Sequence, residues 1–414
     1  MRRLFFSILI IVVSLVTVYE ILSLWRGMGI YQRNLSKETL LKAIRLNSSN
    51  PDPFYRLGML SQWDFSRIDL KESAEYLRKA IERNPLEQQY YLNLAKILNR
   101  MGEKEASERT LEKAIWVFPA GYQGRWVTGN LLLQQGAVEK SLPHFSYILT
   151  HYPGQSSLVY DVLFKAINDT DILFEKVVPK DTSSIKQYLA HLYEIRDKES
   201  AKKVWERKAS YGIKNERHEA LRHIEFLIGQ GDLQDAFRVW KERLKEEGLS
   251  SPSDGNLIVN GGFEKKEILG GGFDWKMGKV SGAEISLDHS AAFEGKSSLK
   301  VFFNGKVNVD FNHVSQFVAL KPNSDYVLKA HMRTKEVTTK NGLKIEISGV
   351  GPSFREASES LTSDNGWKEL TVFFHTPAQS QGAVVRLRRE KSGKFDRFIS
   401  GTVWLDSVSL TERK

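Results

Sequence analysis

The stretch Asn256-Leu-Ile-Val-Asn-Gly-Gly-Phe-Glu264 marks the start of a new domain in a chain whose earlier residues follow helical patterns. Leu257 to Val259 form a short apolar run of the kind found in strands. Asn260-Gly261-Gly262 follows as a turn, because glycine takes up positive φ without steric cost. The sequence therefore predicts that a β-domain begins close to residue 256.

Three later stretches have the same character and carry this domain to the end of the chain. Residues 294–303 are a turn followed by an apolar strand, and residues 318–333 are two strands joined by a Pro-Asn turn. Residues 401–410 have the pattern of a last strand. A lone hairpin pattern would carry little weight, but four in succession predict an all-β domain.

Taken in order, these stretches resemble the carbohydrate-binding modules of the galactose-binding-like, jelly-roll type. The resemblance covers residues 255–412, with Trp275 behind the opening line. The motifs that carry it are N-L-I-V-N-G-G-F-E (256–264), G-K-S-S-L-K-V (295–301), V-A-L-K-P-N-S-D-Y-V-L (318–328), W-K-E-L-T-V (367–372) and L-D-S-V-S-L (405–410). It implies a jelly-roll sandwich and makes sugar binding the expected activity of this domain.

The resemblance also implies a structural Ca²⁺ where the first and last strands meet. The glutamate of the opening line and the aspartate of the closing strand are Glu264 and Asp406 here. Carboxylate and carbonyl oxygens are the ligands that this hard cation prefers. Many relatives carry a second aspartate where this chain has Ser407, so the alternative is that both carboxylates cap turns.

A sugar-binding face needs aromatic rings that stack on pyranoses and a few directed polar groups. Trp275 and Trp367 match positions that usually pack in the core, which is the alternative for both. Phe311 and His313 alternate with polar residues and are expected to share one face of a strand. The candidates are Phe311, His313, Arg355, Trp275 and Trp367.

A basic hairpin lies near the end of the chain. Arg386, Arg388 and Arg389 precede Lys391, Lys394 and Arg397. Such a cluster predicts contact with an anionic polymer or with lipid head groups. The alternative is an ordinary solvated face.

The middle of the chain, residues 36–247, repeats itself. Pro85, Pro119 and Pro153 are spaced by 34 residues and each follows a helical segment. Residues 91–119 resemble one complete tetratricopeptide repeat, with small residues where paired helices cross and proline where the second helix stops. Ala201 and Trp205 recur as Ala236 and Trp240 after a less regular part.

We expect five to six helix pairs that form a solenoid. Such arrays bind protein partners along a groove, and a spacer without partners is the alternative. Trp63, Trp116 and Trp126 are candidates to line the groove, unless they pack between repeats. Residues 248–255 are polar, contain Gly, Ser and Pro, and are interpreted as a linker to the 256–414 domain.

The first 27 residues are interpreted as a transmembrane anchor. The apolar stretch from residue 4 to residue 25 would extend about 33 Å as a helix, close to the ~30 Å hydrocarbon core of a bilayer. Glu20 lies near its far end, where the carboxylate can reach the interface. A cleaved signal peptide is the alternative, although Gly27-Met-Gly29 is a poor cleavage site. We expect a single-pass inner-membrane protein with its bulk outside the cytoplasm.

Composition and motifs argue against several function classes. The formal charge of +10 is divided evenly between residues 1–255 and residues 256–414, whereas nucleic-acid binders cluster their basic residues. The chain has no cysteine, which excludes a thiol nucleophile and cysteine zinc sites. His218-Glu219 lacks the second histidine of H-E-x-x-H, because position 222 is Arg222. Gly295-Lys296-Ser297 lacks the first glycine of a phosphate loop. We expect no enzymatic activity.

The predicted architecture is a membrane anchor, a tetratricopeptide-type solenoid and a carbohydrate-binding-like sandwich. It resembles accessory proteins of bacterial exopolysaccharide assembly and export. The expected function is a scaffold that binds polysaccharide through the C-terminal module and proteins through the repeats. The alternative is a pure protein adaptor whose sandwich no longer binds sugar.

Overall fold

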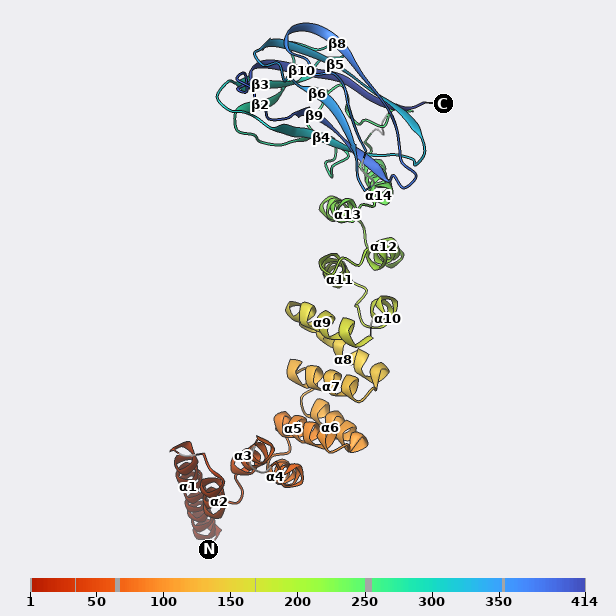
Figure 1. Ribbon diagram of the computed structural model, residues 1–414. Helices are drawn as coiled ribbons and strands as arrows, with labels where there is room; N and C mark the ends of the chain where they lie inside the picture. Colours follow the sequence, from red (N-terminus) through yellow and green to blue (C-terminus); the bar gives the residue numbers. More distant parts are fainter. Residues whose placement is uncertain are drawn as a thin grey trace. The chain divides into compact units, whose positions relative to one another are not determined.

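The computed structural model describes residues 2–33, 35–63, 68–167, 169–249, 255–351 and 354–413. The chain folds into two compact units, residues 1–213 and residues 214–414 (Figure 1). The first unit is helical, and the second joins two helices to a β-sandwich.

The first unit consists of helices that pack in consecutive pairs. Three of them, α4, α6 and α8, end two residues before Pro85, Pro119 and Pro153, as the repeat spacing predicts. Ala80 and Ala114 are fully buried at the expected crossings. The helices are α1 (Arg2–Arg33), α2 (Lys37–Leu46), α3 (Pro51–Trp63), α4 (Leu70–Arg83), α5 (Gln88–Arg100), α6 (Lys104–Val117), α7 (Tyr122–Gln134), α8 (Val138–His151), α9 (Ser156–Ile167), α10 (Thr170–Lys176), α11 (Thr182–Glu194) and α12 (Lys198–Arg207), with short 3₁₀ segments at Pro153–Gln155 and Lys208–Tyr211.

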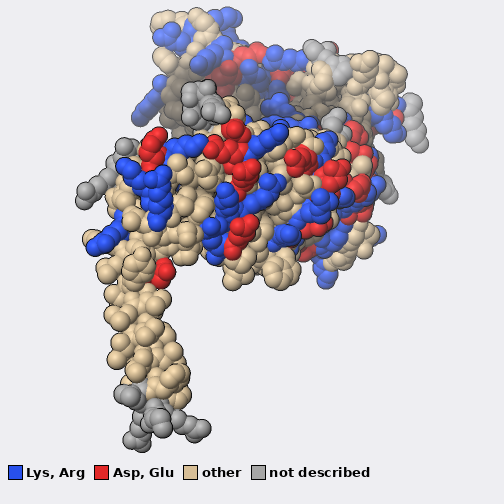
Figure 2. All heavy atoms as spheres, turned by 90° about the horizontal axis from the view of Figure 1, so that it is seen from below, with Lys and Arg blue, Asp and Glu red and all other residues tan. Residues whose placement is uncertain are grey.

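Helix α1 has two parts with different surroundings. In the part of the chain that the structure describes, Phe5–Gln32 is the one helix long and apolar enough to cross a membrane; its length and composition suit an anchor and a signal sequence equally. Figure 2 shows much of it as an almost uncharged rod, while Lys and Arg mix with Asp and Glu over the other helices. Toward its end α1 joins the array, because the Glu20 carboxylate accepts a 2.8 Å hydrogen bond from Asn47 and the Tyr31 hydroxyl donates to Asp52.

The second unit contains α13 (Arg217–Gly229), α14 (Leu233–Glu246) and two five-stranded antiparallel sheets. Sheet A has the order β1-β4-β9-β6-β7 and sheet B the order β2-β3-β10-β5-β8. The strands are β1 (Lys276–Met277), β2 (Ala283–Asp288), β3 (Ser298–Asn304), β4 (Phe311–Ala319), β5 (Asp325–Val337), β6 (Lys344–Gly349), β7 (Arg355–Ala357), β8 (Ser363–His375), β9 (Gly382–Arg389) and β10 (Ser400–Glu412). This confirms the predicted jelly-roll-type sandwich.

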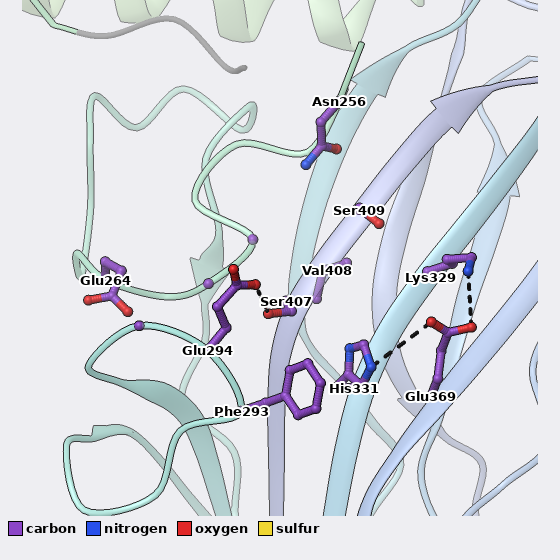
Figure 3. Close-up of a pocket in the computed structure, with 13 residues that line it drawn as sticks. Asn256, Glu264, Phe293, Glu294, Lys329, His331, Glu369, Ser407, Val408 and Ser409 are labelled. Carbon is purple, nitrogen blue, oxygen red and sulfur yellow. Dashed lines mark hydrogen bonds and ion pairs between the residues drawn. The ribbon is translucent and has the colours of Figure 1, made fainter. Parts of the chain in front are cut away.

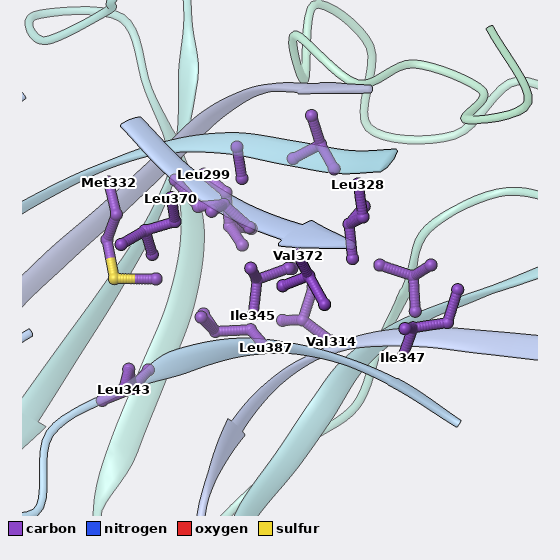
Figure 4. Packing of buried hydrophobic residues seen from close by; sticks show 14 of the residues in the cluster. Leu299, Val314, Leu328, Met332, Leu343, Ile345, Ile347, Leu370, Val372 and Leu387 are labelled. Carbon is purple, nitrogen blue, oxygen red and sulfur yellow. The ribbon is translucent and has the colours of Figure 1, made fainter. Parts of the chain in front are cut away.

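The core lies between the two sheets, where inward-facing aliphatic side chains interdigitate (Figure 4). Leu299, Leu328 and Met332 from sheet B are fully buried against Val314, Ile345 and Leu387 from sheet A. Alternate residues of β4, β5 and β8 face this layer, as expected of a half-buried sheet.

The opening stretch does not form a strand, contrary to the sequence prediction. The backbone N–H and C=O of Val259 both bond at 2.9 Å to the side-chain amide of Gln316, and the Leu257 N–H donates to the carbonyl of Leu410. A side chain thus takes the place of a neighbouring strand. The predicted turn is present, but Asn260 and Phe263 take positive φ rather than the two glycines. Gly261 is needed for close approach instead, because a Cβ there would lie only 2.0 Å from the Val408 carbonyl oxygen.

Helices α13 and α14 pack on the sandwich and belong to its compact unit. The indole of Trp240 donates a 2.7 Å hydrogen bond to the Gly270 carbonyl, and Phe237 contacts Phe273 at 5.1 Å between ring centroids. Gln234 donates to the Leu320 carbonyl at 2.7 Å. The repeat pattern in the sequence assigns α13 and α14 to the helical array. In the structure, however, the boundary between the two compact units lies between residues 213 and 214, so the pair belongs with the sandwich. Residues 250–254 of the predicted linker lie outside the described residues.

Candidate binding sites on the sandwich

A pocket of about 460 Å³ opens on the outer side of sheet B, and we call it the Phe293 pocket (Figure 3). Its walls are the opening loop, the loop before β3 and three neighbouring strands. Strand β5 contributes Lys329 and His331, β8 contributes Glu369, and β10 contributes residues 407–409. The volume lies within the ~300–1,000 Å³ that is typical of ligand pockets.

Aromatic rings form one wall of the Phe293 pocket. Phe293, which is 46% exposed, stacks on His331 with 3.6 Å between ring centroids and 9° between the planes. Trp367 meets Phe293 edge-on at 6.0 Å. Because His331 supports it from behind, the Phe293 ring is held in one orientation at the surface.

Polar groups adjoin these rings. Lys329 Nζ lies 3.1 Å from Glu369 Oε1, and the hydrogen bond from this ammonium holds the pKa of the Glu369 carboxyl below its usual value. His331 Nδ1 is buried and has no hydrogen-bond partner among the described residues. Glu294 accepts a 3.0 Å bond from the Ser407 hydroxyl. The pocket therefore combines an aromatic surface with both donors and acceptors.

Glu264 and Asp406 lie together beside the pocket, as the resemblance implies. Asp406 is fully buried and accepts the N–H groups of Phe293, Glu294 and Ser407, whereas Glu264 accepts those of Lys296 and Ser297. Burial raises the pKa of the Asp406 carboxyl, the backbone N–H groups lower it, and the nearby Glu264 carboxylate raises it again. Two adjacent carboxylates fit a cation, although their present partners are the N–H groups of a turn.

Among the described residues, one other cluster brings together three side chains that could hold a metal ion. It consists of Glu216, His218 and Glu219. Two of its members are exposed, and exposed acidic groups commonly occur without a metal. It adds nothing to the predicted metal site.

Two predicted sugar-binding residues lie in the core, and their assignment is wrong. Phe311 is fully buried against Phe303 at 5.5 Å. Trp275 is 4% exposed, stacks on Phe263 and donates to the Asn260 carbonyl. Neither ring can stack on a pyranose. Trp367 is half-buried and contacts Phe293 without lining the pocket itself. His313 is half-buried on β4.

The other predicted basic residues are divided between the surface of sheet A and the interior. Arg355 bonds at 2.7 Å to the buried Glu346 and at 2.6 Å to Glu390. Arg386 lies 3.7 Å from Glu346, and Arg388 pairs with Asp310. Arg389 is fully buried, so its prediction as a contact for an anionic polymer is wrong.

Sequence reasoning missed most of the Phe293 pocket. Phe293 and Glu294 directly precede the G-K-S-S-L-K-V motif, whereas His331 and Glu369 lie on two strands that pair only in the fold. The one available clue is that Lys329 and His331 alternate with buried Ala330 and Met332 on β5.

Comparisons with known proteins agree with this architecture. Residues 255–392 match the profile of the family described as a carbohydrate binding domain, and residues 88–117 match a tetratricopeptide repeat profile. The chain therefore contains a carbohydrate-binding-type sandwich and tetratricopeptide repeats.

A curated relative and several solved structures are similar to parts of the chain. The tRNA(Glu)-specific nuclease WapA of Bacillus subtilis subsp. natto (strain BEST195) is 24% identical over 163 residues, which are 37% of this chain and only 7% of that protein. A structure of Family 16 Carbohydrate Binding Module-2 is 21% identical and covers 38% of this chain and all of that one, with a TM-score of 0.28. The CBM22-1 xylan-binding domain of Paenibacillus barcinonensis Xyn10C is 16% identical, covers 40% and 99%, and has a TM-score of 0.29. MamA is 20% identical over 32% of this chain and 78% of its own, with a TM-score of 0.28.

Proposed function

We propose that this protein is a non-enzymatic envelope scaffold that binds polysaccharide through its sandwich and protein partners through its helical repeats. Exopolysaccharide assembly or export is the process in which such a scaffold would serve. The Phe293 pocket carries the proposal, because it places a supported, half-exposed aromatic ring beside donors and acceptors. That combination matches the apolar face and the hydroxyl groups of a sugar ring.

Stacking on a sugar costs least when the exposed ring is already held in its binding orientation. Phe293 meets this condition, since His331 covers its rear face and its backbone N–H is bonded to Asp406. Lys329 and Glu369 can bond to hydroxyl groups at the other side of the pocket. The expected ligand is therefore a glycan, with sugar rings lying over Phe293.

Affinity gels that contain neutral or acidic polysaccharides test this proposal. The fragment should begin at residue 214, because α13 and α14 pack on the sandwich. We expect retardation by one class of polymer and about tenfold weaker binding after Phe293→Ala, which corresponds to ~1.4 kcal/mol of lost ring contact. Phe373→Ala is the matched control, because this phenylalanine on β8 is 60% exposed outside the pocket.

Unchanged retardation by Phe293→Ala would place the sugar elsewhere on the module. If no polymer retards the wild-type fragment, the protein is an adaptor whose sandwich does not bind sugar. These outcomes separate the two candidate functions.

The proposed protein contacts are supported by exposed apolar side chains on the array. Trp116 and Phe118, at the end of α6, are 75% and 54% exposed. Trp126 instead packs against Phe145 between helices, and the side chain of Trp63 lies outside the described residues. Exposed aromatic residues are enriched where proteins bind one another.

We infer that α1 anchors the chain in the inner membrane with its bulk in the periplasm.

A structural Ca²⁺ at Glu264 and Asp406 is part of this proposal. We expect chelation with EGTA to lower the melting temperature of residues 214–414 by about 5–10 °C, as loss of a cation worth ~2–3 kcal/mol would do. Differential scanning fluorimetry measures this shift, and added calcium should reverse it. An unchanged melting temperature would mean that the two carboxylates only cap the 293–297 turn.

A further inference from the structure

Three loops meet at one end of the sandwich and are tied together by Arg389. These loops are residues 305–310, 338–343 and 390–399, and the last one follows β9 directly. The buried guanidinium donates to the carbonyls of Asn341 at 2.9 Å and Arg397 at 3.0 Å, and also to that of Val309. Ser392 is held as well, through two bonds to Asn308. The 390–399 loop therefore has a fixed base.

The tip of this loop projects two phenylalanine rings into solvent. Phe395 is 106% exposed and Phe398 is 46% exposed, so the Phe395 ring has essentially no protein surface against it. The loop also exposes three cations, Lys391, Lys394 and Arg397. The last two directly precede Phe395 and Phe398 in the sequence. An apolar ring held away from the body of a folded domain has a higher free energy in water than in an apolar phase, so its transfer to that phase is favourable.

The charges around these rings are mostly positive. Lys306 and Lys340, on the two neighbouring loops, are exposed as well. Asp396 is the acidic residue within the tip, and its carboxylate accepts the N–H of Lys340 at 2.7 Å. The other two acidic residues of the three loops are already paired, Asp310 with Arg388 and Glu390 with Arg355.

We propose that the 390–399 loop inserts Phe395 and Phe398 into the surface of an anionic lipid bilayer, with Lys391, Lys394 and Arg397 among the phosphate head groups. Aromatic rings flanked by lysine and arginine suit the boundary between acyl chains and head groups. A sugar is less suitable here, because a ring that touches nothing offers no wall of donors and acceptors around a ligand. The inference is independent of the proposed polysaccharide binding, since none of the three loops lines the Phe293 pocket.

A fluorescent label on the full-length chain tests this insertion. The protein has no cysteine, so Gly393→Cys creates a unique attachment point. A Cβ there meets nothing within 4 Å, and both phenylalanines stay in place. After labelling with nitrobenzoxadiazole, the protein is reconstituted into phosphatidylcholine vesicles with or without phosphatidylglycerol. We expect a blue shift and brighter emission when phosphatidylglycerol is present, and reversal by raised salt.

Matched variants separate insertion from general adsorption. The same label at Ala378, an exposed residue of the loop that precedes β9, should show no shift. The triple change of Lys391, Lys394 and Arg397 to Gln should weaken insertion about 100-fold, at roughly fivefold for each charge. The control with equal net charge changes the exposed Lys265, Lys266 and Lys296 to Gln and should leave the shift intact. Phe395→Ser should also abolish the shift, unlike Phe373→Ser.

Three results would overturn the proposal. One is unchanged emission with phosphatidylglycerol, and another is an equal shift at Ala378. The third is a shift that soluble polyuronate produces while vesicles do not, which would make the tip a contact for an acidic polysaccharide.

Discussion

Replacing Arg389 by methionine is expected to lower the free energy of unfolding of the sandwich by about 3–5 kcal/mol. Three backbone carbonyls would each lose a hydrogen bond to a charged donor, worth ~1.5–3 kcal/mol, and part of this loss is offset because no charge is then buried. Burial already lowers the pKa of the Arg389 guanidinium, which reflects the cost of holding the charge inside. Methionine keeps an unbranched apolar stem, so packing changes little.

Hydrogen exchange in the full-length protein measures this effect separately for each segment. Amides of β9 and β10 should exchange about two to four orders of magnitude faster in Arg389→Met. Arg386→Met is the control, because that side chain is 30% exposed with one long ion pair to Glu346 and should cost at most ~1 kcal/mol. Equal protection in the two variants would contradict a structural role for Arg389.

The sequence contains the alternation that distinguishes these arginines. Residues two apart on a strand share a face, so Arg389 must face opposite to Arg386 and Arg388 once β9 is placed. What the pattern cannot show is which face is the interior, because a buried arginine and an exposed one look alike in sequence. The three carbonyls that satisfy Arg389 come from loops as far as 80 residues away.

Strand β4 shows the opposite case, in which alternation misleads. The pattern predicts that Phe311 and His313 share one face, but the register of β4 against β9 shifts between Phe311 and Val314. This irregularity turns Phe311 into the core with Val314 and leaves His313 half-buried. A bulge has no reliable signal in a single sequence, so the aromatic face could not be located without the fold.

Local patterns did predict many of the elements, but they wrongly predicted a strand at residues 257–259. Prolines at a 34-residue spacing stop three helices, and the turn residues at 260–262 lie where the β-domain begins. The Phe293 pocket depends instead on which strands pair, because His331 and Glu369 face each other only through the β5–β8 register. Periodicity likewise could not show that α13 and α14 pack on the sandwich, since each repeat presents similar apolar faces to either neighbour.

Trp240→Ala is therefore expected to disrupt the joint between α14 and the sandwich, with a loss of about 3–5 kcal/mol. The indole is fully buried, packs on Phe237 and Phe273 and donates to the Gly270 carbonyl. Large-to-small changes of buried tryptophan cost this much because a cavity remains. The glycines beside it leave little room to rearrange, since a Cβ at Gly271 would already lie 3.4 Å from Trp240 Cδ1.

The repeat itself supplies the control for this prediction. Trp205 occupies the equivalent position on α12 and is 5% exposed, but it belongs to the other compact unit. Trp205→Ala should destabilise its own helices by a similar amount and leave residues 268–274 protected from hydrogen exchange. Trp240→Ala should expose those residues as well as α13 and α14. If both variants left the 268–274 segment equally protected, the helix pair would not stabilise the sandwich, and the division of the chain would lie at the linker rather than before α13.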